Sequence, residues 1–173
     1  SFNVVATDAN STNLITLTAT GAPLIAPISP ATFNQPTTGL GSVTETFQWQ
    51  TVCDHVRLQP YQMVFKAEDN DAFVKLTDLE SVQITVVAPA PQNPTASPIG
   101  NSIQLGWDQS ICQQATGYKI YRRNGFFGFI PSQCETGVPA YTGYSLISTL
   151  TGLTTTSFLD NNKNLWLGLD NGI

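Results

Sequence analysis

Charged side chains are scarce in this sequence of 173 residues, at 11% against roughly 25% in an average soluble domain. Only four Lys and three Arg stand against 12 Asp and Glu, which gives a formal net charge of −5. So few cations cannot form a basic patch, and we therefore expect neither a nucleic acid nor an anionic membrane as a partner. No apolar run approaches the ~20 residues that a membrane-spanning helix needs, so we expect no membrane insertion.

Histidine and cysteine are also rare. The sequence has one histidine, His55, and its three cysteines form no Cys-x-x-Cys pair, which argues against a zinc site. Asp54 precedes His55, but neighbouring side chains on an extended chain point apart, so the pair does not suggest a catalytic triad. A Gly-x-Ser-x-Gly motif is absent as well. The sequence therefore predicts a protein that is not an enzyme.

β-branched residues are abundant, with 22 Thr, 11 Val and 11 Ile. They fit a pleated, half-buried surface and lose side-chain freedom in a helix. In Tyr61–Ala67, for example, apolar residues alternate with Gln and Lys, as in an antiparallel strand with one solvated face. Similar short runs predict an all-β fold, with strands at Phe2–Thr7, Asn13–Ala19, Glu45–Gln50, Tyr61–Ala67, Ser81–Val87, Ser102–Trp107, Gly117–Arg122 and Tyr144–Leu150.

A proline-rich segment divides the chain. Residues 88–98 contain four prolines, which exclude a helix or a central strand and favour a stiff connector. We therefore predict a domain at 1–88, a linker at 89–98 and a second domain at 99–173. Each half is close to the ~100 residues of an immunoglobulin-like sandwich. The predicted fold is thus two immunoglobulin-like β-sandwich domains in tandem.

The second half carries a family resemblance. A strand ending in Trp at Ser102–Trp107 is followed by Tyr-x-Ile-Tyr-Arg within Gly117–Arg122. Together with Pro91–Ala96, these segments resemble strands A, B and C of a fibronectin type III domain, and Thr156–Asp160 resembles its strand E. The Tyr-x-Tyr-x-Val pattern of strand F is absent before Ile173. The resemblance therefore implies a type III sandwich that is incomplete at its C-terminus.

The first half resembles the cadherin-like or PKD-like modules of large bacterial surface proteins. The residues that carry this resemblance are Phe2–Asp8, Asn13–Gly21, Phe47–Trp49 and Pro60–Asp69. Such a module followed by a type III domain is similar to segments of secreted, gliding-associated surface proteins of the Bacteroidetes. This resemblance implies an extracellular or cell-surface location.

The cysteines suggest a disulfide. Cys112 and Cys134 lie in the same predicted domain, and a bond between them would close a loop of about 22 residues, worth ~3 kcal/mol in the chain-entropy model. It would pin the insertion Phe126–Val138 to the sandwich and would fit an oxidising, extracellular compartment. The alternative is three buried, reduced thiols. Cys53 is expected to be buried and free, or to pair with a cysteine outside this sequence.

One acidic cluster is a candidate calcium site. Glu68, Asp69 and Asp71 directly follow a predicted strand, and Asp8 ends another. Cadherin-like modules place carboxylates at one pole in this way, and calcium requires 6–8 oxygen ligands on adaptable loops. The alternative is an ordinary solvated turn, because Asp and Asn are common turn residues. Calcium is the only cofactor that the sequence suggests.

An aromatic stretch is the second candidate site. Residues 126–130 read Phe-Phe-Gly-Phe-Ile, and we group Phe126, Phe127 and Phe129 with Tyr141 and Tyr144 as a candidate ligand or partner surface. Exposed aromatic patches often mark contacts with a sugar or a protein. Alternatively, the rings form a small satellite core, or strands outside this sequence cover them.

These features predict a non-catalytic structural or adhesive spacer in a large secreted bacterial surface protein. Its partners would be neighbouring domains of the same longer chain and a protein or glycan ligand. One alternative is a carbohydrate-binding or accessory module of a secreted polysaccharide-degrading enzyme. Another is a subunit of a surface or secretion assembly whose open sheet edge pairs with another chain.

Overall fold

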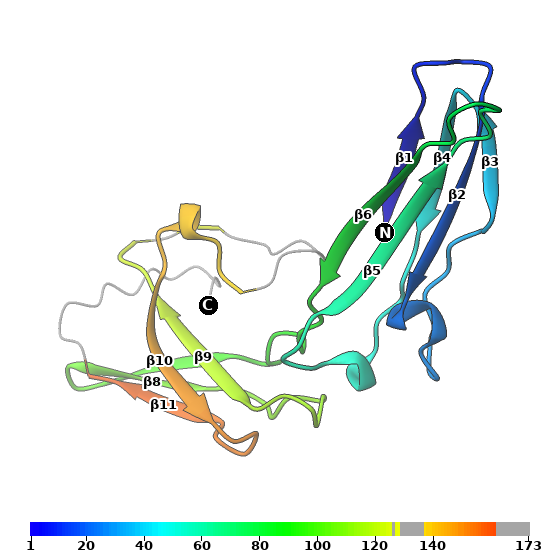
Figure 1. Ribbon diagram of the computed structural model, residues 1–173. Coiled ribbons are helices and arrows are strands. Elements are labelled where there is room, and N and C mark those ends of the chain that lie inside the picture. The colour runs from blue at the N-terminus through cyan, green and yellow to red at the C-terminus, as the bar shows by residue number, and fades with distance from the viewer. Residues whose placement is uncertain (126, 129–136, 162–173) are drawn as a thin grey trace. The chain divides into compact units, whose positions relative to one another are not determined.

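The computed structural model describes residues 1–125, 127–128 and 137–161. The chain divides into two compact units, Ser1–Val86 (unit 1) and Val87–Ile173 (unit 2), shown in Figure 1. The described residues form antiparallel strands, turns and three short 3-10 helices, without an α-helix. The prediction of an all-β chain is confirmed. Within the same residues, no helix is long and apolar enough to cross a bilayer.

Unit 1 consists of six strands in two antiparallel sheets. In the smaller sheet, β1 (Phe2–Thr7) pairs with β4 (Ser42–Phe47). The larger sheet has the order β3-β2-β5-β6. Its strands are β2 (Leu14–Gly21), β3 (Thr37–Leu40), β5 (Tyr61–Glu68) and β6 (Thr77–Ile84), and the 3-10 helices are η1 (Ala22–Ile25) and η2 (Cys53–His55).

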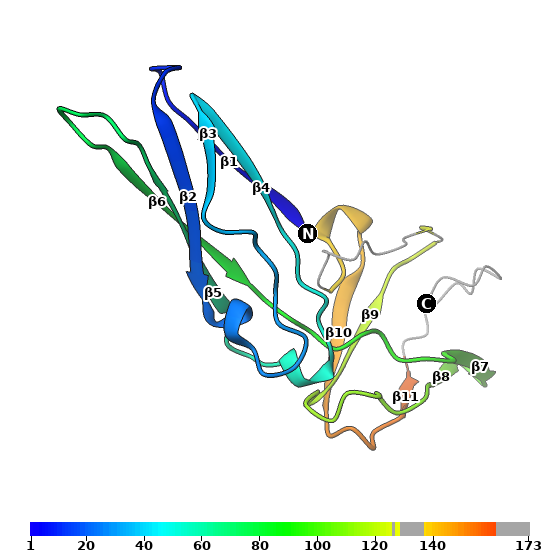
Figure 2. The same ribbon diagram turned by 90° about the vertical axis from the view of Figure 1, so that its right-hand side faces the viewer.

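Both sheets of unit 1 contribute to one hydrophobic core. On β5 the predicted alternation is observed, since Tyr61, Met63 and Phe65 are buried and Gln62 is exposed. The Phe65 ring meets Phe47 of the smaller sheet edge to face, with 6.1 Å between the ring centroids. Figure 2 shows the two groups of strands running alongside each other. The buried members of this core are Ile15, Leu17, Ala19, Ala31, Phe33, Val43, Phe47, Met63 and Phe65.

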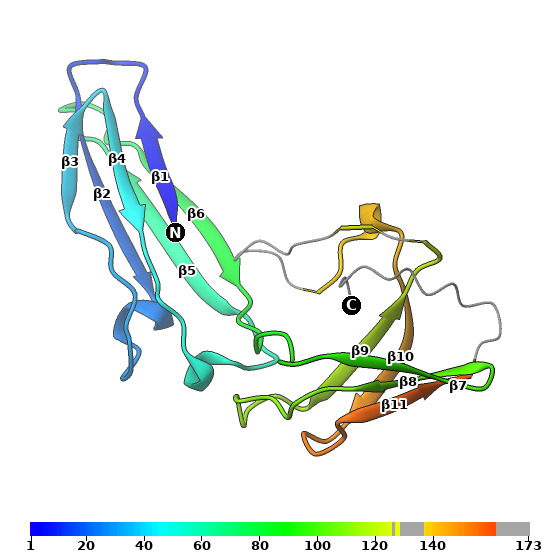
Figure 3. The same ribbon diagram turned by 180° about the vertical axis from the view of Figure 1, so that it is seen from behind.

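The direction of the strands gives unit 1 a base and a tip. Phe2, where β1 begins, pairs with the end of β4, and Ile84, where β6 ends, pairs with the start of β5. The start of β1 and the end of β6 therefore lie toward the same pole, the base. The opposite pole, the tip, consists of the connections 8–13 and 69–76 and of Gly41 (Figure 3).

Gly41 holds two of the tip connections together. Its N–H donates to the Asn13 carbonyl and its own carbonyl accepts from Asp8 N–H, each at 2.9 Å. Its φ of 66° lies in the left-handed region, and a Cβ there would come within 2.8 Å of Ser11 Cα. A side chain at this position would therefore be doubly unfavourable, which explains the glycine.

The described residues of unit 2 form five strands in two small antiparallel sheets. One has the order β11-β8-β7 and the other pairs β10 with β9. The strands are β7 (Thr95–Ile99), β8 (Ser102–Gly106), β9 (Gly117–Arg122), β10 (Ser145–Thr151) and β11 (Ser157–Asp160), with the 3-10 helix η3 (Ala140–Thr142) before β10.

Tyr118 is central to unit 2. Its ring is buried and lies 5.3 Å from the Trp107 ring. Its hydroxyl donates to the Leu153 carbonyl at 2.8 Å and accepts from Ser110 N–H at 2.9 Å. A single β9 side chain thereby fixes two connections that are far apart in sequence.

The two sheets of unit 2 are also linked by an ion pair. Nη1 of Arg122, on β9, lies 3.1 and 3.2 Å from the two carboxylate oxygens of Asp160, on β11. Asp160 is only 8% exposed. The pair therefore supplies the partner that a buried carboxylate needs.

Three local expectations need correction. The sequence pattern did not indicate β3, which is only four residues long. Strand β6 begins at Thr77 rather than at the predicted Ser81. The sequence pattern missed its first half because those residues are exposed and show no apolar alternation. Strand β7 includes Pro98, within the predicted linker 89–98. An edge strand tolerates proline because one side of its backbone has no ladder partner.

Candidate functional site

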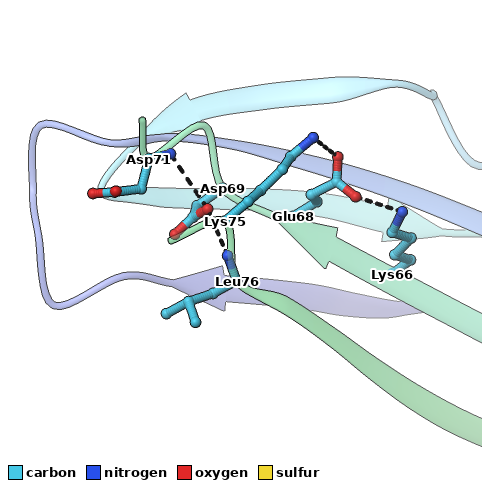
Figure 4. Close-up of polar contacts among 6 residues, drawn as sticks. All are labelled: Lys66, Glu68, Asp69, Asp71, Lys75 and Leu76. Atoms are coloured by element: carbon cyan, nitrogen blue, oxygen red, sulfur yellow. Dashed lines mark hydrogen bonds and ion pairs between the residues drawn. The ribbon is translucent and has the colours of Figure 1, made fainter. Parts of the chain in front are cut away.

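The loop 69–76 between β5 and β6, called the tip loop below, is closed by Asp69. Asp69 N–H donates to the Leu76 carbonyl at 3.1 Å, and Leu76 N–H donates back to Asp69 Oδ1 at 2.8 Å. Figure 4 shows this carboxylate turned toward the Leu76 backbone. Asp69 is 7% exposed, so its charge is stabilised by hydrogen bonds rather than by water.

A second carboxylate shapes the end of the tip loop. Asp71 Oδ1 accepts hydrogen bonds from Val74 N–H at 3.0 Å and Phe73 N–H at 2.8 Å. These bonds lower the pKa of Asp71 below its ordinary value, and the bond from Val74 has the larger effect. Side-chain to backbone bonds of this kind define a turn without help from a sheet. The loop therefore has a defined backbone course although it projects from the sheet.

The ordered loop presents apolar side chains to solvent. Phe73 is 96% exposed, Val74 65% and Leu76 62%. Single exposed apolar residues are ordinary, whereas three within four positions of one loop form a patch of the kind that marks interaction sites. These three side chains are candidate contact residues that the sequence pattern did not reveal. The signal was the run Phe-Val-Lys-Leu after Asp-Asn-Asp, which has no alternation.

Glu68 lies between two lysines where β5 meets the tip loop. Its Oε2 is 2.6 Å from Lys66 Nζ, and its Oε1 pairs with Lys75 Nζ (Figure 4). The hydrogen bonds from Lys66 and then Lys75 lower the pKa of Glu68 to about 2. Lys75 belongs to the tip loop and Glu68 ends β5, so the pair ties the loop to the sheet.

The tip loop is also joined to the β1–β2 connection. Asn70 Oδ1 accepts from Leu14 N–H at 2.7 Å. Within that connection, Asp8 accepts from Asn10 N–H at 2.8 Å and from Asn13 Nδ2 at 3.3 Å. These bonds restrain the tip as one body, so a ligand would meet a surface that is already ordered.

The four carboxylates of the predicted calcium site each have partners within the chain. Asp69 and Asp71 bond backbone N–H groups, Asp8 bonds two asparagines, and Glu68 is neutralised by two lysines. No group of three or more His, Cys, Asp or Glu side chains among residues 1–125, 127–128 and 137–161 could hold a metal ion. In this arrangement Asp69 and Asp71 shape the tip loop through backbone N–H groups, and Glu68 pairs with lysine side chains.

His55, at the base of unit 1, has a structural environment. It is 4% exposed; its Nδ1 accepts from Val52 N–H at 3.1 Å, and its Nε2 lies 2.8 Å from the Ile28 carbonyl. The Val52 bond requires an unprotonated Nδ1, so Nε2 carries the proton and donates to Ile28. Tyr61 Oη donates to the His55 carbonyl at 3.1 Å. His55 thus connects its own segment to Ile28 through the ring and to Tyr61 through the backbone carbonyl.

The predicted aromatic surface is described only in part. Phe126 and Phe129 lie outside the described residues. The Phe127 and Tyr141 rings are 6.4 Å apart at an interplanar angle of 64°, and Tyr141 is 69% exposed. The Arg123 guanidinium lies 5.1 Å from the centroid of Phe127. Tyr144 is half-buried.

A polar hollow adjoins these rings. It has a volume of about 310 Å³, and we call it the arginine hollow. The sequence reasoning did not select it, although two of the three arginines in the chain are adjacent at 122 and 123. Its lining residues are Arg122, Arg123, Asn124, Gly143 and Ser145.

The cysteine pairing differs from the prediction. Cys112 forms a disulfide with Cys53, so Cys53 is neither free nor dependent on a cysteine outside this sequence. A sulfur atom forms one disulfide bond, and Cys112 is therefore not paired with Cys134, which lies outside the described residues. Spacing within one predicted domain was the only guide at the sequence level, and it does not determine connectivity.

Comparison with known proteins returned no relative. No family model matches the chain, no curated protein is significantly similar in sequence, and no solved structure matches it.

Proposed function

We propose that this chain is a non-catalytic structural and adhesive segment of a secreted cell-surface protein. The observation that supports it most directly is the tip loop, which places Phe73, Val74 and Leu76 in solvent on a backbone held by Asp69 and Asp71. Rigid exposed apolar groups cost solubility unless they make a contact, and a rigid loop loses little entropy when it binds. Unit 1 is the adhesive part of this proposal, and its tip is the contact surface.

The proposed fold is an immunoglobulin-like sandwich in each unit. In unit 1, support comes from a single core shared by the sheets β1-β4 and β3-β2-β5-β6. In unit 2, support comes from the separation of β7, β8 and β11 from β9 and β10 into two sheets. This separation is consistent with a type III arrangement in which strands A, B and E share a sheet and C belongs to the other.

The arrangement of polar groups favours binding over catalysis. In unit 1, Asp69, Asp71 and Glu68 are engaged by backbone N–H groups or lysines, and His55 is enclosed. A general acid or base must reach a substrate, so groups engaged in this way are suited to fixing loops. The disulfide between Cys53 and Cys112 supports an oxidising, extracellular compartment.

The experiment is labelling of intact cells of the source organism with an antibody raised against this chain. We expect signal without permeabilisation, and reduced attachment to surfaces when the segment is deleted from its gene. A matched deletion in an unrelated surface protein controls for general damage to the envelope. Signal that appears only after permeabilisation would contradict a surface role, and unchanged attachment would contradict an adhesive one.

A further inference from the structure

Charge is distributed unevenly between the two units. Residues 1–86 contain eight Asp and Glu against three Lys and Arg, a formal net charge of −5, whereas residues 87–173 contain four of each. The acidic excess of the chain therefore belongs to unit 1. Near the tip it comes from five carboxylates and two lysines, a formal net charge of −3, contributed by Asp8, Glu68, Asp69, Asp71, Asp78, Lys66 and Lys75.

The tip thus combines the exposed Phe73 side chain, which we call the apolar point, with the carboxylates around it, which we call the acidic surround. Phe73 is its most exposed side chain, at 96%, and the Asp71 carboxylate sits beneath it, bonded to its N–H. A surface that fits this tip must offer an aromatic or apolar contact together with cations. An anionic membrane offers the wrong charge.

The arginine hollow of unit 2 has that complementary chemistry. Arg123 lines it and also lies over the Phe127 ring, which contacts the exposed Tyr141 ring. Arg122 lines it too, and its guanidinium is oriented by Asp160. Arginine side chains and aromatic rings are the residue types most enriched at the centres of protein interfaces.

We propose that the tip loop of one copy of this chain docks at the arginine hollow of a second copy. Phe73 then packs against Phe127 and Tyr141, and the acidic surround of the tip faces Arg122 and Arg123. The two surfaces differ, so the contact is head to tail and each bound copy leaves one tip and one hollow open for further copies. This inference rests on the proposed adhesive function and identifies its partner as the chain itself.

The test is sedimentation velocity on the purified chain over a range of concentrations, in low salt and in high salt. We expect the sedimentation coefficient to rise with concentration at about 0.02 M salt and to return to the monomer value at about 0.5 M, because exposed charges are screened. The same measurement is made with each variant.

Two variants remove the two halves of the contact. Phe73→Ser deletes the apolar point, and Arg123→Glu reverses a charge in the hollow. Each is expected to weaken association about tenfold or more, as substitutions at interface centres do. Ile25→Ser and Lys119→Glu are the matched controls. Ile25 is 82% exposed at the base of unit 1, and Lys119 is an exposed cation on β9 outside the hollow.

A charge exchange separates a specific contact from general charge effects. Asp78 is exposed at the start of β6, and its side chain accepts a hydrogen bond from the N–H of its neighbour Leu79. Asp78→Lys alone should weaken association, and adding Arg123→Glu should restore it. Thermal melting of each variant verifies that it is folded. If Arg123→Glu proves to be misfolded, the association of Phe73→Ser tests the contact in its place.

Several outcomes would overturn the proposal. These are a monomer at every concentration, association that Phe73→Ser leaves unchanged, and binding of polygalacturonate, an acidic glycan probe, at Arg123 without self-association. If the chain is monomeric but still labels on intact cells and supports attachment, the adhesive function stands and only the choice of partner fails.

Discussion

Asp69 and Leu76 exchange two hydrogen bonds across the neck of the tip loop, at 3.1 Å through the Leu76 carbonyl and at 2.8 Å through the Asp69 carboxylate. The second bond is the kind that a sheet ladder cannot supply, because it uses a side chain where the two strands have parted. A buried carboxylate thereby does what one more pair of strand residues would do, and it leaves the six residues between free to project.

Removing this carboxylate should open the loop. We expect Asp69→Ala to lower the free energy of unfolding of unit 1 by about 2 kcal/mol, since the Leu76 N–H would lose a charged acceptor. Denaturant unfolding measures the loss, and hydrogen exchange at Leu76 N–H locates it. Asp69→Asn retains an acceptor oxygen and should lose less. If Ala and Asn variants are equally stable, the bond does not hold the loop.

Acid should weaken the attachment of the tip loop to β5. Glu68 has a pKa of about 2 in the folded chain and an ordinary value of 4.5. Because the folded value is the lower one, its contribution to stability is complete above pH 4.5 and is lost as pH falls toward 2. NMR titration of the Glu68 carboxyl carbon should give a midpoint near 2, and Lys66→Met should raise it. An ordinary midpoint in the unmodified chain would contradict the paired arrangement.

Removing the enclosed imidazole of His55 should lower the free energy of unfolding. His55→Ala leaves Val52 N–H and the Ile28 carbonyl without their partner and creates a cavity beside Trp49, whose ring is 4.7 Å from His55. We expect a loss of about 2–4 kcal/mol, measured by chemical denaturation. Leu58→Ala nearby in sequence, at an 81% exposed position, should change stability by less than about 0.5 kcal/mol. A loss no larger than that of Leu58→Ala would contradict the structural role.

In unit 2 the corresponding test is the loss of one hydroxyl. Tyr118→Phe keeps the ring but removes the partner of Ser110 N–H and the Leu153 carbonyl, so we expect a loss of about 1–3 kcal/mol. Thermal unfolding followed by circular dichroism measures it. Lys119→Ala, at the next position of β9, is exposed and serves as the control. Equal melting temperatures for both variants would show that the hydroxyl bonds are dispensable.

The disulfide connectivity can be read directly. Proteolysis of the unreduced chain at low pH, followed by mass spectrometry, should release a peptide containing Cys53 bonded to one containing Cys112. Reduction should separate the two masses. A peptide that links Cys112 to Cys134 would contradict this pairing and restore the one that sequence spacing favours.

The strands that sequence could predict are those with a buried face. Tyr61–Ala67 and Gly117–Arg122 show the period of two because alternate residues enter a core, and both are strands. Strand β3 and the first half of β6 lie at sheet edges, where no residue is fully buried and no apolar pattern is imposed. Pro98 suggested a linker, but it lies in β7, which is also an edge strand. The rule against proline holds for central strands.

The site was predicted in part. Adjacent carboxylates at the end of β5 marked the tip as a candidate site, but the sequence left both a calcium site and an ordinary solvated turn open. Where each carboxylate oxygen points depends on the tertiary structure, and oxygens of Asp69 and Asp71 accept from backbone N–H groups.

The sequence by itself determined the class of the fold, because β-branched content and alternation express how many residues must face a core. The tertiary structure alone decided which carboxylates bond the backbone, which cysteines pair and which apolar side chains stay in solvent. Each of these depends on distances between residues far apart in the chain or on the direction of a loop. Neither produces a periodic pattern of apolar residues in the sequence.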